Sequence, residues 1–195
     1  MLDETRAGEL VRKAKAGTLT LLEAEQVIAS LKLGHGGVDT YHLLYIVGRS
    51  FQAHEEELVA SYLECSEDPM LARLALQILC DQWNKTEKYL NEVRRFAAGV
   101  VWDSQDDVRQ VAISIAGEYL RAHDEAQLFE LLLSISEGPA DEYSALPGFA
   151  VEALARALGD EWEGIPGVGE RSRETRWQQQ VIDRAYEEYF SRYAP

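Results

Sequence analysis

The sequence predicts an all-α fold, and three observations support this prediction. Apolar residues recur three and four positions apart in nearly every apolar run, which is the spacing of an amphipathic helix. Strand-like alternation of apolar and polar residues between turn residues is absent. The five prolines, at 69, 139, 147, 166 and 195, fall in predicted turns, in first turns of helices or at the terminus. Start and stop signals then divide the chain into about ten helices.

Capping residues define the helices of the N-terminal half. A Ser, Thr, Asp or Asn before an apolar run is a typical N-cap, and a glycine after the run is a typical end. The predicted segments are, in chain order, Asp3 to Ala16 before Gly17, Thr20 with Glu23 as a capping box to Gly34, Asp39 to Phe51, the HEEE run (54–57) to about Cys65, and Asp68–Pro69 to Trp83.

The same rules divide the C-terminal half. The predicted starts are Thr86, Ser104 together with Asp107, Asp124, a segment at about 146–149, and Thr175 after a glycine-rich loop that begins at Asp160. Three glycines, Gly8, Gly48 and Gly117, fall inside predicted helices, where each costs up to about 1 kcal/mol relative to alanine. Close helix crossings at these positions would explain them.

An internal repeat is the strongest feature of the sequence. Shifting residues 68–83 by 37 places them over 105–120, and a further shift of 38 reaches 146–158. The matched columns are Leu71, Val108, Leu146; Ala75, Ala112, Ala150; Ile78, Ile115, Ala153; Leu79, Ala116, Leu154; and Trp83, Leu120, Leu158. A small residue in the middle of each first helix lets a neighbouring helix approach closely, and the flanking aliphatic residues are then buried.

This repeat resembles the HEAT-repeat family of α-solenoids, whose first helix often carries an Asp, a Val-Arg pair and then an Ala. Asp107, Val108, Arg109 and Ala112 match that pattern best. The 68–83 copy has Pro69 and a shifted arginine, and the 146–158 copy lacks the Asp and the Arg. The resemblance implies one HEAT-like domain over residues 1–195, a right-handed α-solenoid of about five stacked antiparallel helix pairs, at about 3–33, 39–65, 68–99, 104–137 and 146–192.

Charge excludes two classes of partner. The chain has 34 Asp and Glu against 19 Lys and Arg, which gives a formal net charge of −15. A nucleic acid or an anionic membrane would be repelled. The sequence has no apolar run of signal-peptide or membrane-spanning length, and Cys65 and Cys80 are predicted to be free thiols in apolar helices. We therefore expect a cytoplasmic protein.

No motif in the sequence defines a reaction. The four histidines, His35, His42, His54 and His123, lie on separate segments without metal-ligand spacing. His54-Glu55 is similar to the His-Glu pairs of HEAT-like deoxyhypusine hydroxylases, but one copy cannot build their iron site. Residues 164–171 lack the strand and lysine of a phosphate-binding loop, and the acids of 103–107 are expected to cap a helix rather than to bind calcium. HEAT-like alkylpurine DNA glycosylases rely on a basic groove, whereas the local basic clusters of this sequence, Arg94-Arg95 and Arg171, Arg173 and Arg176, each lie next to acidic residues. We expect no catalytic residue, no metal and no cofactor.

Acidic residues next to aromatic residues are the best candidates for partner binding, because Trp and Tyr are favoured anchors of protein interfaces. Residues 1–99 hold 11 basic and 15 acidic side chains, whereas residues 100–195 hold 8 and 19. The candidates therefore lie in the second half: Trp102, Asp103, Asp106, Asp107, Glu130, Asp141, Glu142, Tyr143, Glu161, Trp162 and Glu163. Glu130 also aligns with Glu57 and Glu92 as a possible ladder on the second helices of the pairs.

These features favour a non-enzymatic binding protein with a basic protein partner. Small, acidic HEAT-like proteins are similar to bacterial immunity proteins, which neutralise a toxin by occluding its active site; a basic, nucleic-acid-targeting toxin would fit such a surface. The alternatives are an adaptor or assembly scaffold that binds a peptide or subunit, and a HEAT-like enzyme that depends on a cofactor. The sequence leaves the oligomeric state open.

Overall fold

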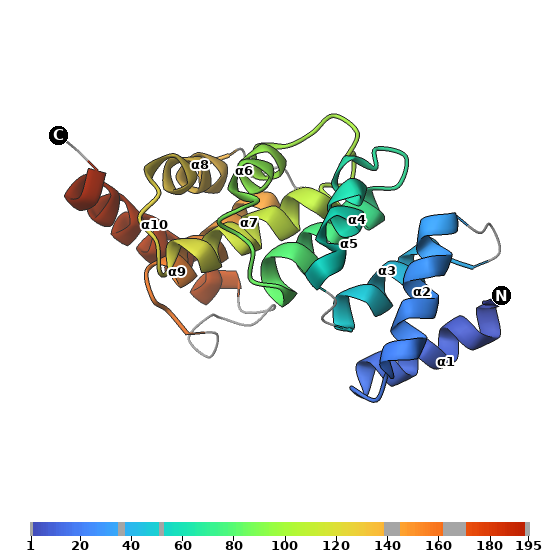
Figure 1. Ribbon diagram of the computed structural model, residues 1–195. Coiled ribbons are helices and arrows are strands. Elements are labelled where there is room, and N and C mark those ends of the chain that lie inside the picture. The colour runs from blue at the N-terminus through green and yellow to red at the C-terminus, as the bar shows by residue number, and fades with distance from the viewer. Residues whose placement is uncertain (1, 35–37, 51–52, 139–144, 162–170, 194–195) are drawn as a thin grey trace. The chain divides into compact units, whose positions relative to one another are not determined.

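Helices form all the regular secondary structure in the described part of this computed structural model, residues 2–34, 38–50, 53–138, 145–161 and 171–193 (Figure 1). The all-α prediction is confirmed for these residues. The α-helices are α1 (Glu4–Lys15), α2 (Leu21–Leu33), α3 (Thr40–Arg49), α4 (Glu56–Ala60), α5 (Pro69–Gln77), α6 (Leu90–Ala98), α7 (Asp107–Leu120), α8 (Ala126–Ser136), α9 (Leu146–Ala157) and α10 (Arg171–Tyr193).

The chain forms two compact units. Unit 1 comprises Met1–Leu90 and Val101–Val108, and unit 2 comprises Asn91–Val100 and Arg109–Pro195. Helices α1 and α2 lie within residues 3–33, and α9 and α10 lie within 146–193, which ends one residue beyond the predicted pair at 146–192. The stacking of the pairs into a single HEAT-like solenoid stays a prediction.

Helix α3 is the centre of the N-terminal part of unit 1, because α1, α2 and α5 all pack against it. The predicted caps are confirmed here. The Thr20 side chain accepts a hydrogen bond from the Glu23 backbone and the Glu23 carboxylate accepts one from the Thr20 backbone, which completes the capping box of α2. Asp39 caps α3 and Asp68 caps α5 through their side chains. Local sequence thus determines where these helices begin.

Gly48 permits a close crossing between α3 and the segment after α5. A Cβ at Gly48 would lie 2.5 Å from Ile78 Cγ1, so only glycine fits without a shift of the neighbour. Ile78–Gln82 is one turn of π-helix that continues α5. Beyond it, the Trp83 indole N–H donates to the Gly48 carbonyl at 3.1 Å. That carbonyl is in the last turn of α3, where carbonyls have no partner within the helix.

The predicted helix from the HEEE run to Cys65 is wrong as a continuous element. Short 3-10 turns at Ala53–Glu55 and Ser61–Glu64 flank the five-residue α4. Both cysteines are free thiols, as predicted; Cys80 is buried and Cys65 half-buried.

In unit 2, α9 contacts three other helices among the described residues. It packs against α8 and α10, and it crosses α7 at Gly117, where a Cβ would stand 2.5 Å from the Ala153 carbonyl oxygen. The close crossings predicted at Gly48 and Gly117 are therefore confirmed. The one predicted at Gly8 is wrong, since nothing among the described residues lies within 4 Å of a Cβ placed there.

The repeated columns coincide with the buried faces of α5, α7 and α9. The alanine column, Ala75, Ala112 and Ala150, is completely buried in all three helices. The aliphatic columns beside it are buried as well, and only Trp83 and Leu158 of the last column are half-buried. The sequence repeat is therefore a repeat of core positions.

Four predicted helix starts are wrong. Helix α10 begins at Arg171, within the predicted glycine-rich loop and four residues before the predicted start at Thr175. The Thr86 hydroxyl donates to the Cys80 carbonyl, and α6 begins only at Leu90. Helix α7 begins at Asp107, with Asp103 rather than Ser104 as the side-chain acceptor. Glu125, not Asp124, caps α8 by accepting from the Leu128 N–H.

Candidate protein-binding surface

The predicted partner-binding residues fall into three groups. Trp102, Asp103, Asp106 and Asp107 belong to unit 1, and Glu130 and Glu161 belong to unit 2. The remaining five, Asp141, Glu142, Tyr143, Trp162 and Glu163, lie outside the described residues. Only the residues of the first two groups, and their neighbours among the described residues, can be assessed as a binding surface.

Asp103 has a structural role at the start of α7. Its side chain is buried, with 5% of the residue exposed, and Oδ2 accepts a hydrogen bond from the Val108 N–H at 2.9 Å. The Asp106 N–H donates to the Asp103 carbonyl, and Asp106 adopts a left-handed conformation with φ of 58°. This turn satisfies a backbone donor that the first turn of a helix leaves unpaired. Little of the Asp103 carboxylate remains for a partner.

Trp102, Asp106 and Asp107, on the same turn, are half-buried. Each keeps part of its side chain accessible next to the buried Asp103.

Glu130 and Glu161 both present exposed carboxylates in unit 2, but with different surroundings. Glu161 is 68% exposed and pairs with Arg121 at 2.6 Å. Glu130 lies on the exposed side of α8 and makes no ion pair with any described residue. Of the two, Glu130 is the carboxylate whose charge is available to a partner.

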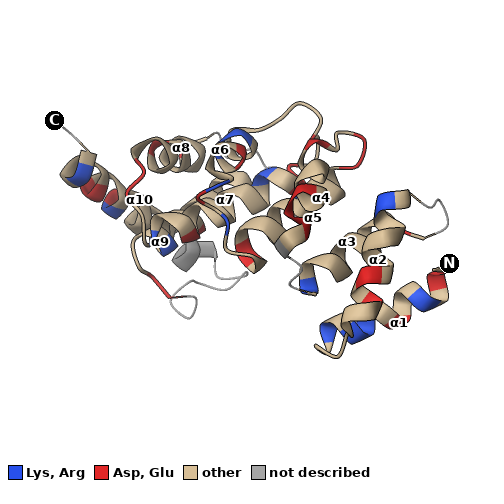
Figure 2. Cartoon of the chain, viewed as in Figure 1, with Lys and Arg blue, Asp and Glu red and all other residues tan. Residues whose placement is uncertain are grey.

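Internal ion pairs use many of the cations of this chain and leave a surplus of acid. Within the described residues, the Lys and Arg side chains that pair with a carboxylate include Arg6, Lys13, Lys32, Lys85, Lys88, Arg94, Arg121, Arg184 and Arg192. Exposed glutamates without an ion pair to a described residue include Glu25, Glu57, Glu67, Glu87, Glu118, Glu130 and Glu187. Figure 2 shows acidic residues on most helices of both units.

The surplus is shared almost equally between the units. Unit 1 has nine Lys and Arg against 17 Asp and Glu, a net charge of −8, and unit 2 has ten against 17, a net charge of −7. Counted by sequence halves, the C-terminal half is far more acidic. The difference arises because Asp103, Asp106 and Asp107 belong to unit 1, whereas Glu92, Arg94 and Arg95, with a net charge of +1, belong to unit 2.

Two carboxylates of unit 1 are held by cations inside the fold. Glu56 accepts hydrogen bonds from Lys85, Lys88 and the Tyr89 hydroxyl, and the two lysines are the main reason that its pKa falls to about 2. Lys13 and the Thr20 backbone lower the pKa of Glu23 to about 2, and Arg6 also contacts it. The Glu23 cluster joins α1 to α2, and the Glu56 cluster joins α4 to the segment that precedes α6.

Helix α10 carries an acidic aromatic face that the sequence analysis missed. Phe190 is 60% exposed, and its ring stacks on Tyr186 with centroids 6.1 Å apart. The exposed Asp183 and Glu187 lie seven and three residues before Phe190, on the same side of the helix. Val181 and Ala185 are buried on the opposite side. We call Asp183, Tyr186, Glu187 and Phe190 the α10 face.

The α10 face was visible in the sequence as an aromatic pair four residues apart with acids between them. That pattern is equally typical of a helix whose aromatic residues are buried. Only the packing of the opposite side of α10 decides which side stays exposed.

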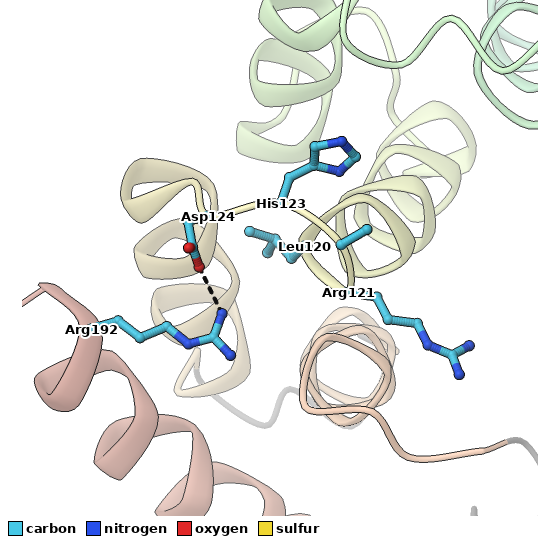
Figure 3. Close-up of a pocket in the computed structure, with 6 residues that line it drawn as sticks. Leu120, Arg121, His123, Asp124 and Arg192 are labelled. Carbon is cyan, nitrogen blue, oxygen red and sulfur yellow. Dashed lines mark hydrogen bonds and ion pairs between the residues drawn. The ribbon is translucent and has the colours of Figure 1, made fainter.

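A polar pocket of about 300 Å³ lies between the end of α7 and α10, lined by residues 120–124 and Arg192. Arg192 donates to Asp124 at 2.8 Å and also pairs with Glu188 (Figure 3). Arg121 points away from that pair and contacts Glu161. Since both guanidinium groups already have carboxylate partners, an anion would have to displace one of them. The pocket is therefore a poor anion site.

Metal-ligating residues are not grouped in the part of the chain that the structure describes: no three His, Cys, Asp or Glu side chains there are placed to hold an ion. His54 and His123 are exposed, and the His123 ring stacks on Tyr119. His42 is half-buried beside Asp39, and His35 lies outside the described residues. None of the described helices has the length and hydropathy required to cross a bilayer.

Comparisons with protein-family models, with curated proteins and with solved structures found no match to this chain.

Proposed function

We propose that this chain is a non-enzymatic protein-binding module whose partner presents a basic surface. The observation that carries the proposal is the set of exposed glutamates that form no ion pair with a described residue, on a chain of net charge −15. Uncompensated surface charge of one sign steers a partner of the opposite sign and raises the rate of association. A nucleic acid is unsuited to the same surface, because its phosphates are also negative.

The α10 face is the part of this surface best suited to contact. An exposed Phe190 stacked on Tyr186 supplies an apolar anchor, and Asp183 and Glu187 supply charge next to it. Interfaces commonly combine a central aromatic anchor with a charged rim. We include Glu130 as a further carboxylate of unit 2, and Trp102, Asp106 and Asp107 as candidates of unit 1.

The more specific form of the proposal is an immunity protein that neutralises a basic toxin by covering its active site. It rests on the HEAT-like sequence repeat and on the acidic surface. A tight complex of one molecule of each protein is expected. An adaptor or scaffold would use the same surface with weaker, micromolar binding.

Binding is tested by immobilising the full chain, capturing partners at about 50 mM salt and measuring their dissociation up to about 500 mM salt. The proposal expects a partner with a basic surface whose association rate falls steeply with salt. A generic basic protein, lysozyme, serves as the control for nonspecific attraction and should bind at least about a hundredfold more weakly. A partner that binds equally at both salt concentrations would contradict the proposal.

A matched pair of charge reversals then locates the surface. Asp183→Lys with Glu187→Lys changes the α10 face, whereas Glu25→Lys with Glu67→Lys makes the same change of net charge in unit 1. The first double variant should slow association and speed dissociation, and the second should slow association only slightly. Equal losses would show that net charge alone attracts the partner, and would contradict the α10 face as the contact.

The immunity role is distinguished from the adaptor role in cells. The captured partner is expressed from an inducible promoter with and without this chain, and growth is measured. An immunity protein restores growth that the partner alone abolishes, and the Phe190→Ser variant loses this protection. A partner that is harmless by itself would contradict the immunity role and favour the adaptor.

A further inference from the structure

A second surface, opposite in charge to the first, lies at one end of the three-helix group α1, α2 and α3. Three exposed cations of unit 1, Arg12, Lys15 and Arg49, form no ion pair with any described carboxylate. Arg12 and Lys15 are in the last turn of α1, and Arg49 is the last residue of α3. Figure 2 shows basic residues gathered at these two helix ends. On a unit of net charge −8, such a group of unpaired cations requires an explanation.

Tyr45 brings two of these cations to one place. The Lys15 ammonium lies 5.8 Å and the Arg49 guanidinium 5.5 Å from the centre of the Tyr45 ring, within the range of a cation–π contact. The contact holds the charged groups over the ring and leaves their N–H donors accessible, since both residues are exposed. A ligand carboxylate could therefore meet both cations.

Helix dipoles account for part of this charge only. A helix C-terminus carries about half a negative charge, and cations in the last turn are favourable there. Two such ends, those of α1 and α3, compensate about one of three positive charges. The end of this three-helix group therefore keeps a net positive charge.

A pocket of about 260 Å³ opens beside these cations. Arg49 and Ser50 line one side, Gly17 and Thr20 line the connection between α1 and α2, and Leu19, Leu21 and two alanines supply apolar walls. Leu21, which lines the pocket, is 63% exposed, and the next residue, Leu22, is 65% exposed, although exposing a leucine side chain to water costs free energy. Pockets for cofactors are usually larger, roughly 300–1,000 Å³, so this one fits a single side chain.

We propose that this pocket, bounded by α1, the first turn of α2 and the end of α3, binds an acidic peptide segment that carries an apolar side chain. The apolar side chain would lie between Leu19 and Leu21, and a neighbouring carboxylate would contact Arg49 and Lys15. The cations and the exposed leucine side chains together determine which peptide binds. The cations repel a basic peptide, and the leucines favour a peptide with an apolar side chain. This partner differs in charge from the basic partner of the proposed function, so one chain would contact two different proteins.

The probe is a fluorescein-labelled hexapeptide in which leucine and glutamate alternate, titrated with the full chain and followed by fluorescence anisotropy. Two peptides of equal length are controls, one with lysine for glutamate and one with serine for leucine. The proposal expects micromolar binding of the first peptide and at least about tenfold weaker binding of each control. Absence of binding, or equal binding of all three, would overturn it.

Variants localise the binding. Arg49→Glu and, separately, Leu21→Ser should each weaken binding of the acidic peptide about tenfold or more. Arg176→Glu changes an exposed arginine of α10 by the same charge and should leave binding unchanged. Because Arg49, Leu21 and Arg176 are exposed, all three variants should keep the far-UV circular dichroism of the parent; Lys15→Glu replaces Arg49→Glu if that variant does not.

Amide chemical shifts give an independent readout. The peptide should shift the resonances of Gly17, Thr20 and Ser50, which line the pocket. Shifts confined to other residues would overturn the assignment. A concentration-dependent dimer that Arg49→Glu dissociates would also count against it, because a second copy of the chain would then occupy the pocket.

Discussion

Gly117 of α7 and Ala153 of α9 are so close that a Cβ on Gly117 would lie 2.5 Å from the Ala153 carbonyl oxygen and 2.6 Å from its Cα. The obstacle is backbone, which cannot rotate aside as a side chain can. The cost of a methyl group here therefore exceeds the gain in helix propensity, which is up to about 1 kcal/mol.

Gly117→Ala should lower the free energy of unfolding by about 1–3 kcal/mol, measured by urea denaturation followed by circular dichroism. Gly8→Ala is the matched control, because α1 has open space at that position among the described residues. It should raise the free energy of unfolding by up to about 1 kcal/mol. A Gly117→Ala variant as stable as the parent would contradict the close crossing of α7 and α9.

Acid should weaken unit 1 through Glu56. The pKa of this carboxylate is lowered in the folded chain to about 2, from an ordinary value of 4.5, because it is bonded to Lys85 and Lys88. Its contribution to stability is therefore complete above about pH 4.5 and is lost as the pH falls towards 2.

Glu56→Gln should cost about 1–2 kcal/mol at pH 7, since Lys88 is largely exposed and its contact is screened. At pH 2 the variant and the parent should be nearly equal in stability. Urea midpoints at several pH values measure this convergence. A difference that stays constant with pH would show that Glu56 acts by packing rather than by charge.

Asp103 should prove more important for folding than for binding. Asp103→Ala removes the acceptor for the Val108 N–H and should cost about 1–2 kcal/mol. Asp103→Asn keeps an acceptor oxygen and should cost less. Thermal unfolding measures both, and if the cap explains the role of Asp103, the asparagine variant should bind a basic partner as tightly as the parent.

Trp83 should stabilise unit 1 by satisfying the Gly48 carbonyl. Trp83→Phe keeps an aromatic ring and removes the indole N–H donor, so it should cost about 1 kcal/mol, measured by urea denaturation. A Trp83→Phe variant as stable as the parent would contradict this role of the hydrogen bond to Gly48.

Helix starts were predictable from the sequence wherever the cap is local. Thr20 with Glu23, Asp39 and Asp68 all bond to backbone groups within three residues, and each was predicted correctly. Asp124 was predicted as a cap, but its carboxylate bonds to Arg192, which is 68 residues further along the chain. No local pattern contains that contact, and Glu125 takes the cap instead.

The candidate surface was less predictable than the fold. An acidic residue next to a tryptophan looks the same in sequence whether it is buried, as Asp103 is, or exposed, as Glu161 is. The unpaired cations Arg12, Lys15 and Arg49 could not be recognised either, because the sequence does not show which cations Glu23 and Glu56 engage. Both distinctions depend on packing between helices.

The π-helical turn Ile78–Gln82 sets the direction in which Trp83 points. A π-turn holds one residue more than an α-turn, and each residue of an α-helix rotates the next by about 100°. Deleting a single residue from this turn would restore a regular helix and would swing the indole away from α3, leaving the Gly48 carbonyl unpaired. The number of residues in this short segment, more than their identity, therefore determines which helix end receives the hydrogen bond from the Trp83 indole.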